Sequence, residues 1–295
     1  MLILISDQFD ETLPKILTKH GEITTDKSRL AEVDIVLVRS KTKVTKEYID
    51  SAPNLKMIIR GGVGLDTIDV EYAKEKAIVV NNTGEASTIA VAELAFALMM
   101  ALPNNICKSD SSMRKGEWLK KELTRTELNG KTLGILGMGR IGTALALRAR
   151  AFRMKILAWH PDVHFSDFAE IKYSLEEILT DSDYISLHMP LVNNTRELIN
   201  KDSLAYCKNG AFIINTGRAQ CGVEKDVAEA LKTGKLGGFA TDVWYSDPPE
   251  NSPLLDAPNC IFTPHIGAST EENMIRIGIV IERTISNFVK GYGNF

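Results

Sequence analysis

The hydrophobic residues of this chain form short, continuous apolar runs that are separated by longer segments with helical periodicity. Runs in the first third of the chain lie at residues 2–5, 33–38, 55–59 and 78–80, and later runs lie at 131–136, 155–159, 184–188, 211–215, 237–243 and 260–263. A short apolar run between helices is typical of a strand that is buried on both faces of a parallel sheet. The pattern therefore predicts an α/β protein with two doubly wound, Rossmann-like parallel sheets.

A strongly apolar helix, predicted over residues 88–102, and a charged loop after it separate the two groups of strands. The last helical stretch, residues 272–292, is expected to return to the first group. The predicted organisation is a discontinuous domain of residues 1–97 and 268–295 and a second domain of residues 98–267. We expect a ligand-binding cleft between them, because domain interfaces are frequent ligand sites.

Composition excludes several classes of function. Of 295 residues, 44% are hydrophobic and 25% charged, and 38 acidic against 35 basic residues give a net charge of −3. Nothing here favours a nucleic-acid or membrane partner. The cysteines lack zinc-site spacings, the longest apolar segment contains Glu93, and the first apolar run lacks the basic flank of a signal peptide. We expect a cytoplasmic protein without a metal.

The most specific motif is a glycine fingerprint in "KTLGILGMGRIGTALALRARAF", residues 131–152. Gly137, Gly139 and Gly142 follow a predicted strand and open a predicted helix. The first glycine permits a tight turn, the second lets the backbone approach a pyrophosphate, and the third lets the helix pack on the strand. Amides of the helix start, around Arg140 and Ile141, would hold the phosphates. The strand at 155–159 favours dinucleotide binding over a turn kept only for packing.

The end of that second strand bears on the choice between NAD and NADP. His160 stands where an acid usually binds the adenosine ribose, and Asp162 lies two residues further on. Residues 160–171 contain no arginine or lysine, the residues that a 2′-phosphate would require. The sequence therefore favours NAD, although His160 is also compatible with either cofactor or with an exposed loop.

Further stretches resemble one family. "IRGGVGLDTIDVEYAKEKAIVVNNT", "GMGRIG", "SLHMPLVNNT", "FIINTGRAQCGVEKDVAEAL" and "FTPHIGASTEEN" follow one another in the order typical of it and span most of the chain. With the fingerprint, they resemble the D-isomer-specific 2-hydroxyacid dehydrogenase family, and within it most of all the short forms that oxidise D-3-phosphoglycerate.

The resemblance implies three catalytic residues. These are His265 of the "PHIG" motif as acid/base, Arg218 of "NTGR" to orient the substrate, and Asp247 as the carboxylate beside the imidazole. The residue types suit the chemistry, because imidazole titrates near neutral pH and a guanidinium pairs bidentately with a carboxylate. Relatives usually have glutamate before the proline, whereas here Asp247 precedes Pro248. The alternative for Asp247 is a turn-forming residue.

The resemblance also implies cofactor contacts beyond the fingerprint. Asp242 would accept a hydrogen bond from the nicotinamide carboxamide, the alternative being a solvated acid at a strand end. The segment at 188–190 would flank the adenine, the alternative being a strand end that packs on its own core. The full implied set is His188, Met189, Pro190, Thr195, Thr216, Arg218, Asp242, His265 and Gly267.

Substrate contacts are implied in the first half of the chain. Gly62, Val63 and Gly64 of "RGGVGLD" offer successive amides to an oxyanion, or form only a tight turn. Arg39, Arg60 and Lys120 match the positions at which the family contacts a substrate phosphate. The two arginines follow apolar strands, at the sheet edge where α/β proteins bind ligands, whereas Lys120 is also consistent with a solvated charged face.

The predicted function is NAD-dependent oxidation of D-3-phosphoglycerate to 3-phosphohydroxypyruvate, the entry to serine biosynthesis. One alternative is a general D-2-hydroxyacid dehydrogenase or glyoxylate/hydroxypyruvate reductase, and a remote one is an NAD-sensing interaction protein without turnover. The only predicted partners are the small-molecule substrate and a second copy of the chain. The helix at 88–102 is more apolar than a single buried face requires. The resemblance implies that this helix lies at the dimer contact, which predicts a homodimer; the alternative is that the helix is buried within the monomer.

Overall fold

The computed structural model describes residues 1–161 and 163–291 and divides into two compact units. The first unit consists of Met1–Thr88 and Ala268–Phe295, and the second of Ile89–Gly267. The boundary predicted after residue 97 falls inside the helix α4, Thr88–Ala101. Ala92, Ala95 and Leu98 of this helix pack in one core cluster with Leu133 and Ile135. The helix therefore belongs to the second unit from its first turn onward.

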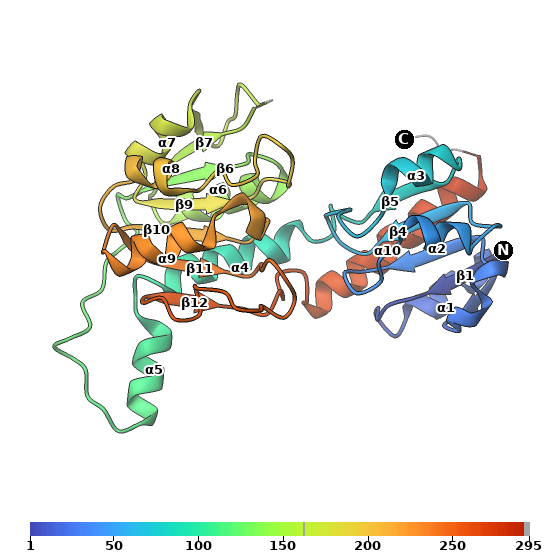
Figure 1. The fold of residues 1–295 in the computed structure, drawn as a ribbon, viewed down its shortest axis with the longest axis horizontal. Coiled ribbons are helices and arrows are strands. Elements are labelled where there is room, and N and C mark those ends of the chain that lie inside the picture. Colours follow the sequence, from blue (N-terminus) through green and yellow to red (C-terminus); the bar gives the residue numbers. More distant parts are fainter. Residues whose placement is uncertain (162, 292–295) are drawn as a thin grey trace. The chain divides into compact units, whose positions relative to one another are not determined.

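The first unit is a five-stranded parallel sheet in the order β2-β1-β3-β4-β5 (Figure 1). Ile277, Ile281 and Ile285 of α10 recur every fourth residue and form the apolar stripe that packs on one face of the sheet. The strands are β1 (Leu2–Ile5), β2 (Glu22–Thr24), β3 (Ile35–Val38), β4 (Met57–Arg60) and β5 (Val79–Asn82). The helices are α1 (Leu13–Leu17), η1 (Thr18–His20), η2 (Lys27–Glu32), α2 (Lys46–Asp50), α3 (Val70–Glu75) and α10 (Glu271–Val289).

The second unit is a seven-stranded parallel sheet in the order β12-β11-β10-β9-β6-β7-β8. The chain runs outward from β6 to β8 and then returns to the other side of β6, so that the strand order reverses between β6 and β9. Ligands of open α/β sheets bind beyond the carboxyl ends of the strands at such a reversal. The strands are β6 (Thr132–Leu136), β7 (Lys155–Trp159), β8 (Glu170–Ile171), β9 (Tyr184–Leu187), β10 (Ala211–Asn215), β11 (Leu236–Thr241) and β12 (Cys260–Phe262).

The helices of the second unit connect these strands and cover both faces of the sheet (Figure 1). After α4 they are α5 (Ile106–Arg114), α6 (Arg140–Ala151), α7 (Leu175–Asp181), α8 (Lys201–Tyr206), η3 (Ala219–Cys221) and α9 (Glu224–Lys232). One core cluster, around Ile213 and Phe239, fills one side of the sheet, and another, around Leu133 and Leu145, fills the other.

The predicted α/β class with two parallel sheets is confirmed, and each predicted apolar run overlaps a strand. The prediction lacked β2 and β8. Both are two- or three-residue strands at a sheet edge. One face or edge of such a strand meets solvent, so it does not need a continuous apolar run.

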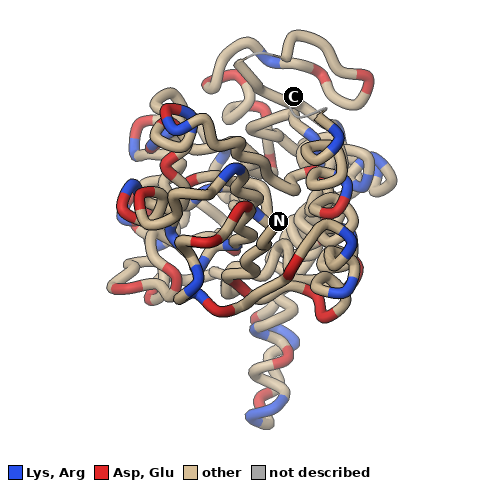
Figure 2. The backbone as a smooth tube through the Cα atoms, turned by 90° about the vertical axis from the view of Figure 1, so that its right-hand side faces the viewer, with Lys and Arg blue, Asp and Glu red and all other residues tan. Residues whose placement is uncertain are grey.

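Lys and Arg positions alternate with Asp and Glu positions along the backbone in the view of Figure 2. Within residues 1–161 and 163–291, no group of three or more His, Cys, Asp or Glu side chains is arranged to hold a metal. In the same part of the chain, no single helix has the length and apolar character to cross a membrane; only α4 and α5 taken together, bent by 64°, pass by length and composition.

Candidate active site

The glycine turn after β6 is shaped by contacts that a side chain would prevent. Gly137 has a φ of +105°, and a Cβ there would lie 2.8 Å from the carbonyl oxygen of His188. A Cβ on Gly142 would lie 2.3 Å from the carbonyl oxygen of Gly137, so the start of α6 packs directly on the turn. At Gly139 a Cβ would meet nothing within 4 Å. The second glycine thus faces open space, as an approaching pyrophosphate requires.

The amino end of α6 supports the same interpretation. Gly139 is its N-cap residue, and no side chain caps the helix. The first amides of a helix have no partner within the helix and carry a partial positive charge. Arg140 is exposed beside them, and Ile141 packs partly against the core. The residues present therefore fit a dinucleotide, with the turn and these amides holding its phosphates.

The residues at the end of β7 are only partly described. Trp159 ends the strand and His160 follows it, half-buried. Asp162, the alternative candidate for the adenosine ribose, lies outside the described residues. The ribose contact is thus assigned from the sequence alone.

His188 lies beside the glycine turn, which brings the predicted segment 188–190 next to the fingerprint. Its Nε2 lies 2.8 Å from Ser186 Oγ, and its Nδ1 lies 3.4 Å from Thr216 Oγ1. Burial lowers the pKa of His188 to about 4. Its ring is therefore neutral at neutral pH and is held by two hydroxyl groups.

The loop after His188 is closed by Thr195. The Thr195 hydroxyl donates to the carbonyl oxygen of Pro190 at 2.6 Å and accepts from the amide of Val192 at 2.9 Å. Met189 is buried and forms part of the core on one side of the sheet. These residues give the loop a defined shape beyond the carboxyl end of β9.

The imidazole of His265 pairs with Asp247. Nδ1 lies 2.5 Å from Asp247 Oδ2, with the two side chains 42% and 47% exposed. An ionised carboxylate only accepts hydrogen bonds, so Nδ1 carries the hydrogen. Nε2 is then the nitrogen available to exchange a proton with a substrate oxygen.

The backbone around His265 is also held. His265 has a φ of +55°, in the left-handed region. The buried carboxylate of Asp242 accepts from the amides of Ile266 and Gly267, at 2.8 and 2.7 Å. Trp244 Nε1 donates to the carbonyl oxygen of Thr263 at 3.1 Å.

The loop that carries Arg218 follows β10 and is shaped by Asn215. The Asn215 side chain accepts from the amide of Gly217 and donates to the carbonyl oxygen of Arg218, both at 3.0 Å. Arg218 Nη1 donates to the carbonyl oxygen of Gly217 at 2.8 Å. The sequence analysis did not single out Asn215. Its signal was available, since a polar residue ends the apolar run "AFII".

In the first unit, the carboxyl ends of β3 and β4 bring the predicted substrate residues together. Val38 and Arg60 are register partners in the two strands. A Cβ on Gly61 would lie 3.3 Å from Arg39 Cγ, and one on Gly62 would lie 2.5 Å from Arg60 Nη1. Both arginine side chains therefore lie against the glycine loop of residues 61–64.

Two polar residues that the sequence analysis missed hold this region in shape. Asp7, after β1, accepts from the amides of Arg39 and Thr42 at 2.6 and 3.1 Å. Asn82 Nδ2 donates to the carbonyl oxygen of Val63 at 2.7 Å. Both contacts join segments far apart in sequence. Lys120, the third predicted cation, is an exposed residue of the second unit.

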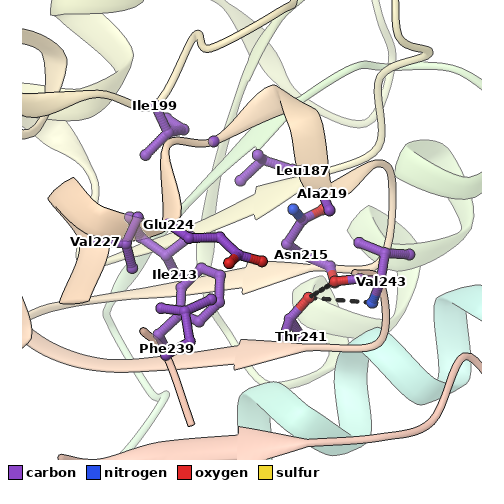
Figure 3. A pocket seen from close by; sticks show the side chains of 12 residues that line it. Leu187, Ile199, Ile213, Asn215, Ala219, Glu224, Val227, Phe239, Thr241 and Val243 are labelled. Carbon is purple, nitrogen blue, oxygen red and sulfur yellow. Dashed lines mark hydrogen bonds between the residues drawn. The ribbon is translucent and has the colours of Figure 1, made fainter. Parts of the chain in front are cut away.

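A small cavity of about 10 Å³ lies beneath the carboxyl ends of β9, β10 and β11 (Figure 3). Glu224 and the polar ends of Asn215 and Thr241 border it, with apolar side chains around them. It has room for about one water molecule and not for a cofactor or substrate. The cavity is a packing gap behind the loops that carry the predicted site.

The second unit is thus a doubly wound sheet with a glycine fingerprint at the reversal of its strand order, which defines a dinucleotide-binding protein. Residues 96–267 match the family model described as D-isomer specific 2-hydroxyacid dehydrogenase, NAD binding domain. The chain belongs to this family, as its motifs predicted, and the predicted cofactor NAD is confirmed.

Relatives with known names match the chain over nearly its whole length. It is 40% identical to D-3-phosphoglycerate dehydrogenase of Methanocaldococcus jannaschii, with 98% of this chain and 57% of that protein covered, so it spans little more than half of that relative. It is 41% identical to hydroxypyruvate reductase of Thermotoga maritima, with 95% and 96% covered. The structure of D-lactate dehydrogenase from Aquifex aeolicus, complexed with NAD and lactic acid, superposes with a TM-score of 0.87 at 28% identity, covering 99% and 96%.

Proposed function

We propose that this NAD-dependent 2-hydroxyacid dehydrogenase oxidises D-3-phosphoglycerate to 3-phosphohydroxypyruvate, the entry to serine biosynthesis. The observation that carries the choice of substrate is the pair Arg39 and Arg60 beside the amide-rich loop of residues 61–64. A substrate with a carboxylate at one end and a phosphate at the other uses both features. A substrate with an uncharged tail has no use for two guanidinium groups there.

In this proposal, each catalytic residue has one task. His265 takes the hydroxyl proton on Nε2, while Asp247 accepts from Nδ1 and holds the ring in one tautomer. Arg218 pairs with the substrate carboxylate and steadies the developing carbonyl. NAD, when bound, accepts the hydride. In reduction, the protonated imidazole returns the proton to the carbonyl oxygen.

The environment of Arg39 suits an anion. Burial lowers the pKa of Arg39, while the nearby Asp7 acts in the opposite direction. A partly desolvated guanidinium gains more from an anionic partner than a fully hydrated one does, because its charge is less screened. Asp7 is engaged with backbone amides of the Arg39 loop. In this proposal, the Arg39 guanidinium is therefore the group that binds the substrate phosphate.

The second candidate is a general reductase of glyoxylate or hydroxypyruvate. One observation favours this alternative. The hydroxypyruvate reductase of Thermotoga maritima, 41% identical to this chain, is matched over 96% of its own length. The decisive measurement is kcat/KM for D-3-phosphoglycerate and for D-glycerate, and in reduction for hydroxypyruvate and glyoxylate, each with NAD(H) and NADP(H).

Replacement of Arg39 or Arg60 by alanine separates the two candidates. We expect kcat/KM for D-3-phosphoglycerate to fall about 100-fold, as for loss of one partner of a desolvated charge pair, and kcat/KM for glyoxylate to change less than about threefold. Arg29→Ala, which removes an arginine paired with Glu22 and Glu32 elsewhere in the same unit, is the matched control. Equal losses with both substrates would favour the general reductase.

The remaining assignments are also proposals. Detection of substrate-dependent NADH formation would eliminate the NAD-sensing protein without turnover. We propose a cytoplasmic location, which the absence of disulfides at Cys107, Cys207 and Cys260 supports. We also propose a homodimer. The exposed apolar side chains of Ile106, Met113 and Trp118, which follow α4, support it.

A further inference from the structure

The carboxylate of Asp242 binds the chain itself. Asp242 follows β11 and is only 2% exposed. Its Oδ1 accepts from Thr263 Oγ1 at 2.7 Å and from the amide of Ile266 at 2.8 Å, and its Oδ2 accepts from the amide of Gly267 at 2.7 Å. Three donors from the "TPHIG" segment thus converge on one buried acid.

These contacts lie directly after a residue with an unfavourable backbone conformation. His265 has a φ of +55°, a strained conformation for a residue other than glycine that persists only where surrounding contacts impose it. The amides of Ile266 and Gly267 are the next two along the chain. Their convergence on one carboxylate fixes the direction in which the backbone leaves His265.

Gly267 permits this approach. A Cβ at this position would lie 2.8 Å from Asp242 Oδ2, too close for any other residue without displacement of the carboxylate. On the amino side of His265, the Thr263 amide donates to the carbonyl oxygen of Thr241 at 3.0 Å. The backbone is therefore held both before and after the histidine.

We propose that Asp242 is the positioning residue for His265 and holds its backbone in the left-handed conformation that directs the imidazole toward Asp247. The inference rests on the proposed acid/base role of His265. The segment 242–247 then controls the histidine twice, through its backbone by Asp242 and through Nδ1 by Asp247. The family resemblance assigns Asp242 to the nicotinamide carboxamide. Three of about four acceptor positions on a carboxylate are already used by the chain.

The test is Asp242→Asn, which keeps the shape of the side chain and replaces one acceptor oxygen by a donor. We expect hydrogen exchange of the Ile266 and Gly267 amides to speed up about tenfold or more, because a hydrogen bond to a charged acceptor is lost. We expect kcat to fall about 100-fold, as a misplaced catalytic group causes, while the Kd for NADH changes less than about threefold. A large rise in this Kd with unchanged exchange would overturn the proposal in favour of the carboxamide role.

A matched control and a milder variant protect the test from a folding failure. Asp183 lies at the opposite, amino end of the same sheet and accepts from the Thr132 amide at 2.8 Å and from Lys208 Nζ at 3.1 Å. Asp183→Asn should lower stability without changing kcat or the exchange of residues 266 and 267. Thr263→Val removes one of the three donors to Asp242 and leaves the two amide donors in place, so it should lower kcat less, about threefold to tenfold.

The readouts separate this proposal from the proposed function. Amide exchange and NADH binding do not require turnover, so faster exchange in Asp242→Asn would support the positioning role of Asp242 on the backbone even if no 2-hydroxy acid were oxidised by the parent protein. Absence of turnover in the parent would instead contradict the proposed function. Unchanged exchange together with unchanged kcat would refute the positioning role.

Discussion

The carboxylate that pairs with His265 belongs to Asp247, one methylene shorter than the glutamate that the family resemblance led us to expect before Pro248. In the structure the pair is closed, with 2.5 Å between Nδ1 of His265 and Oδ2 of Asp247. The aspartate side chain is therefore long enough to reach the imidazole. Asp247 is thus more than a turn-forming residue in front of a proline.

Replacement of Asp247 by asparagine should lower turnover while the protein stays folded. Asn keeps the size of the side chain and removes the charge of the group that accepts from Nδ1. The imidazole is then held less firmly in one tautomer, so we expect kcat to fall about 10- to 100-fold. The exposed Asp256 provides the control Asp256→Asn. A pH–rate profile identical to that of the parent protein would remove Asp247 from the mechanism.

The buried ring of His188 should make the protein less stable in mild acid. Its pKa is lowered from 6.5 to about 4. Between pH 6.5 and pH 4 the unfolded chain therefore binds a proton that the native ring does not bind. The free energy of unfolding is unaffected by this group above pH 6.5, and it falls progressively as the pH is lowered from 6.5 toward 4. Between pH 7.5 and pH 5 the free energy of unfolding should fall by about 1–2 kcal/mol through this group.

Urea unfolding at the two pH values measures this effect. His188→Gln lacks the titrating ring and should lose less stability between pH 7.5 and pH 5 than the parent protein does. The exposed His164 gives the control His164→Gln, which should behave like the parent. If His188→Gln and the parent lost stability equally, the ring would be titrating normally.

At the level of elements, the turn between β6 and α6 combines two requirements that separate glycines meet. Gly142 lets the helix pack on the turn, and Gly139 leaves space in front of the helix amides. The sequence motif predicted both roles. The structure shows that the first role is steric within the protein, whereas the second concerns only what approaches from outside.

Two alanine substitutions should therefore affect different properties, one the stability of the protein and the other its affinity for NADH. Gly142→Ala places a methyl group 2.3 Å from the Gly137 carbonyl oxygen and should destabilise the protein by about 2–3 kcal/mol, as overpacking does. Gly139→Ala meets no protein atom and should change stability by less than about 0.5 kcal/mol, yet weaken NADH binding at least about tenfold, because the methyl group occupies the space of the pyrophosphate. Thermal unfolding and fluorescence titration with NADH check the pair. Equal affinity of Gly139→Ala and the parent would contradict the assigned phosphate position.

At the level of the whole molecule, apolar side chains on α5 and the loop after it are largely exposed. Ile106 and Met113 are each 55% exposed and Trp118 is 72% exposed, and α5 extends away from the sheet of its unit (Figure 1). Of the 14 residues of the preceding helix α4, six are buried, namely Ala90, Val91, Ala92, Ala95, Leu98 and Met99. The support for a dimer therefore comes from α5 and its loop more than from α4, on which the sequence argument relied.

Light scattering after size exclusion tests the dimer. The parent protein at micromolar concentration should have twice the mass of the chain, and Trp118→Glu should shift the equilibrium toward the monomer, because a charge would be buried in the interface. Tyr173, 79% exposed elsewhere in the second unit, gives the control Tyr173→Glu, which should leave the mass unchanged. A monomeric parent protein would refute the proposal.

The sequence by itself determined the features that depend on local patterns. Buried parallel strands need continuous apolar runs, so the central strands of both sheets were predictable. The fingerprint at residues 137–142 predicted the dinucleotide site because the spacing of its glycines is a local pattern. The motifs around Arg218 and His265 indicated the family in the same way.

Only the tertiary structure decided what holds these residues in place. Asp242 reaches amides 24 and 25 residues further along the chain, and Asp7 reaches an amide 32 residues away. Such contacts leave no periodic or local trace, because any strand-end acid looks alike in a sequence. The edge strands β2 and β8 were not predicted for a related reason. They are strands because they pair with β1 and β7, and their composition does not indicate it. A buried polar group must find a partner wherever the fold brings one, and that partner is set by the sheet order rather than by sequence neighbours.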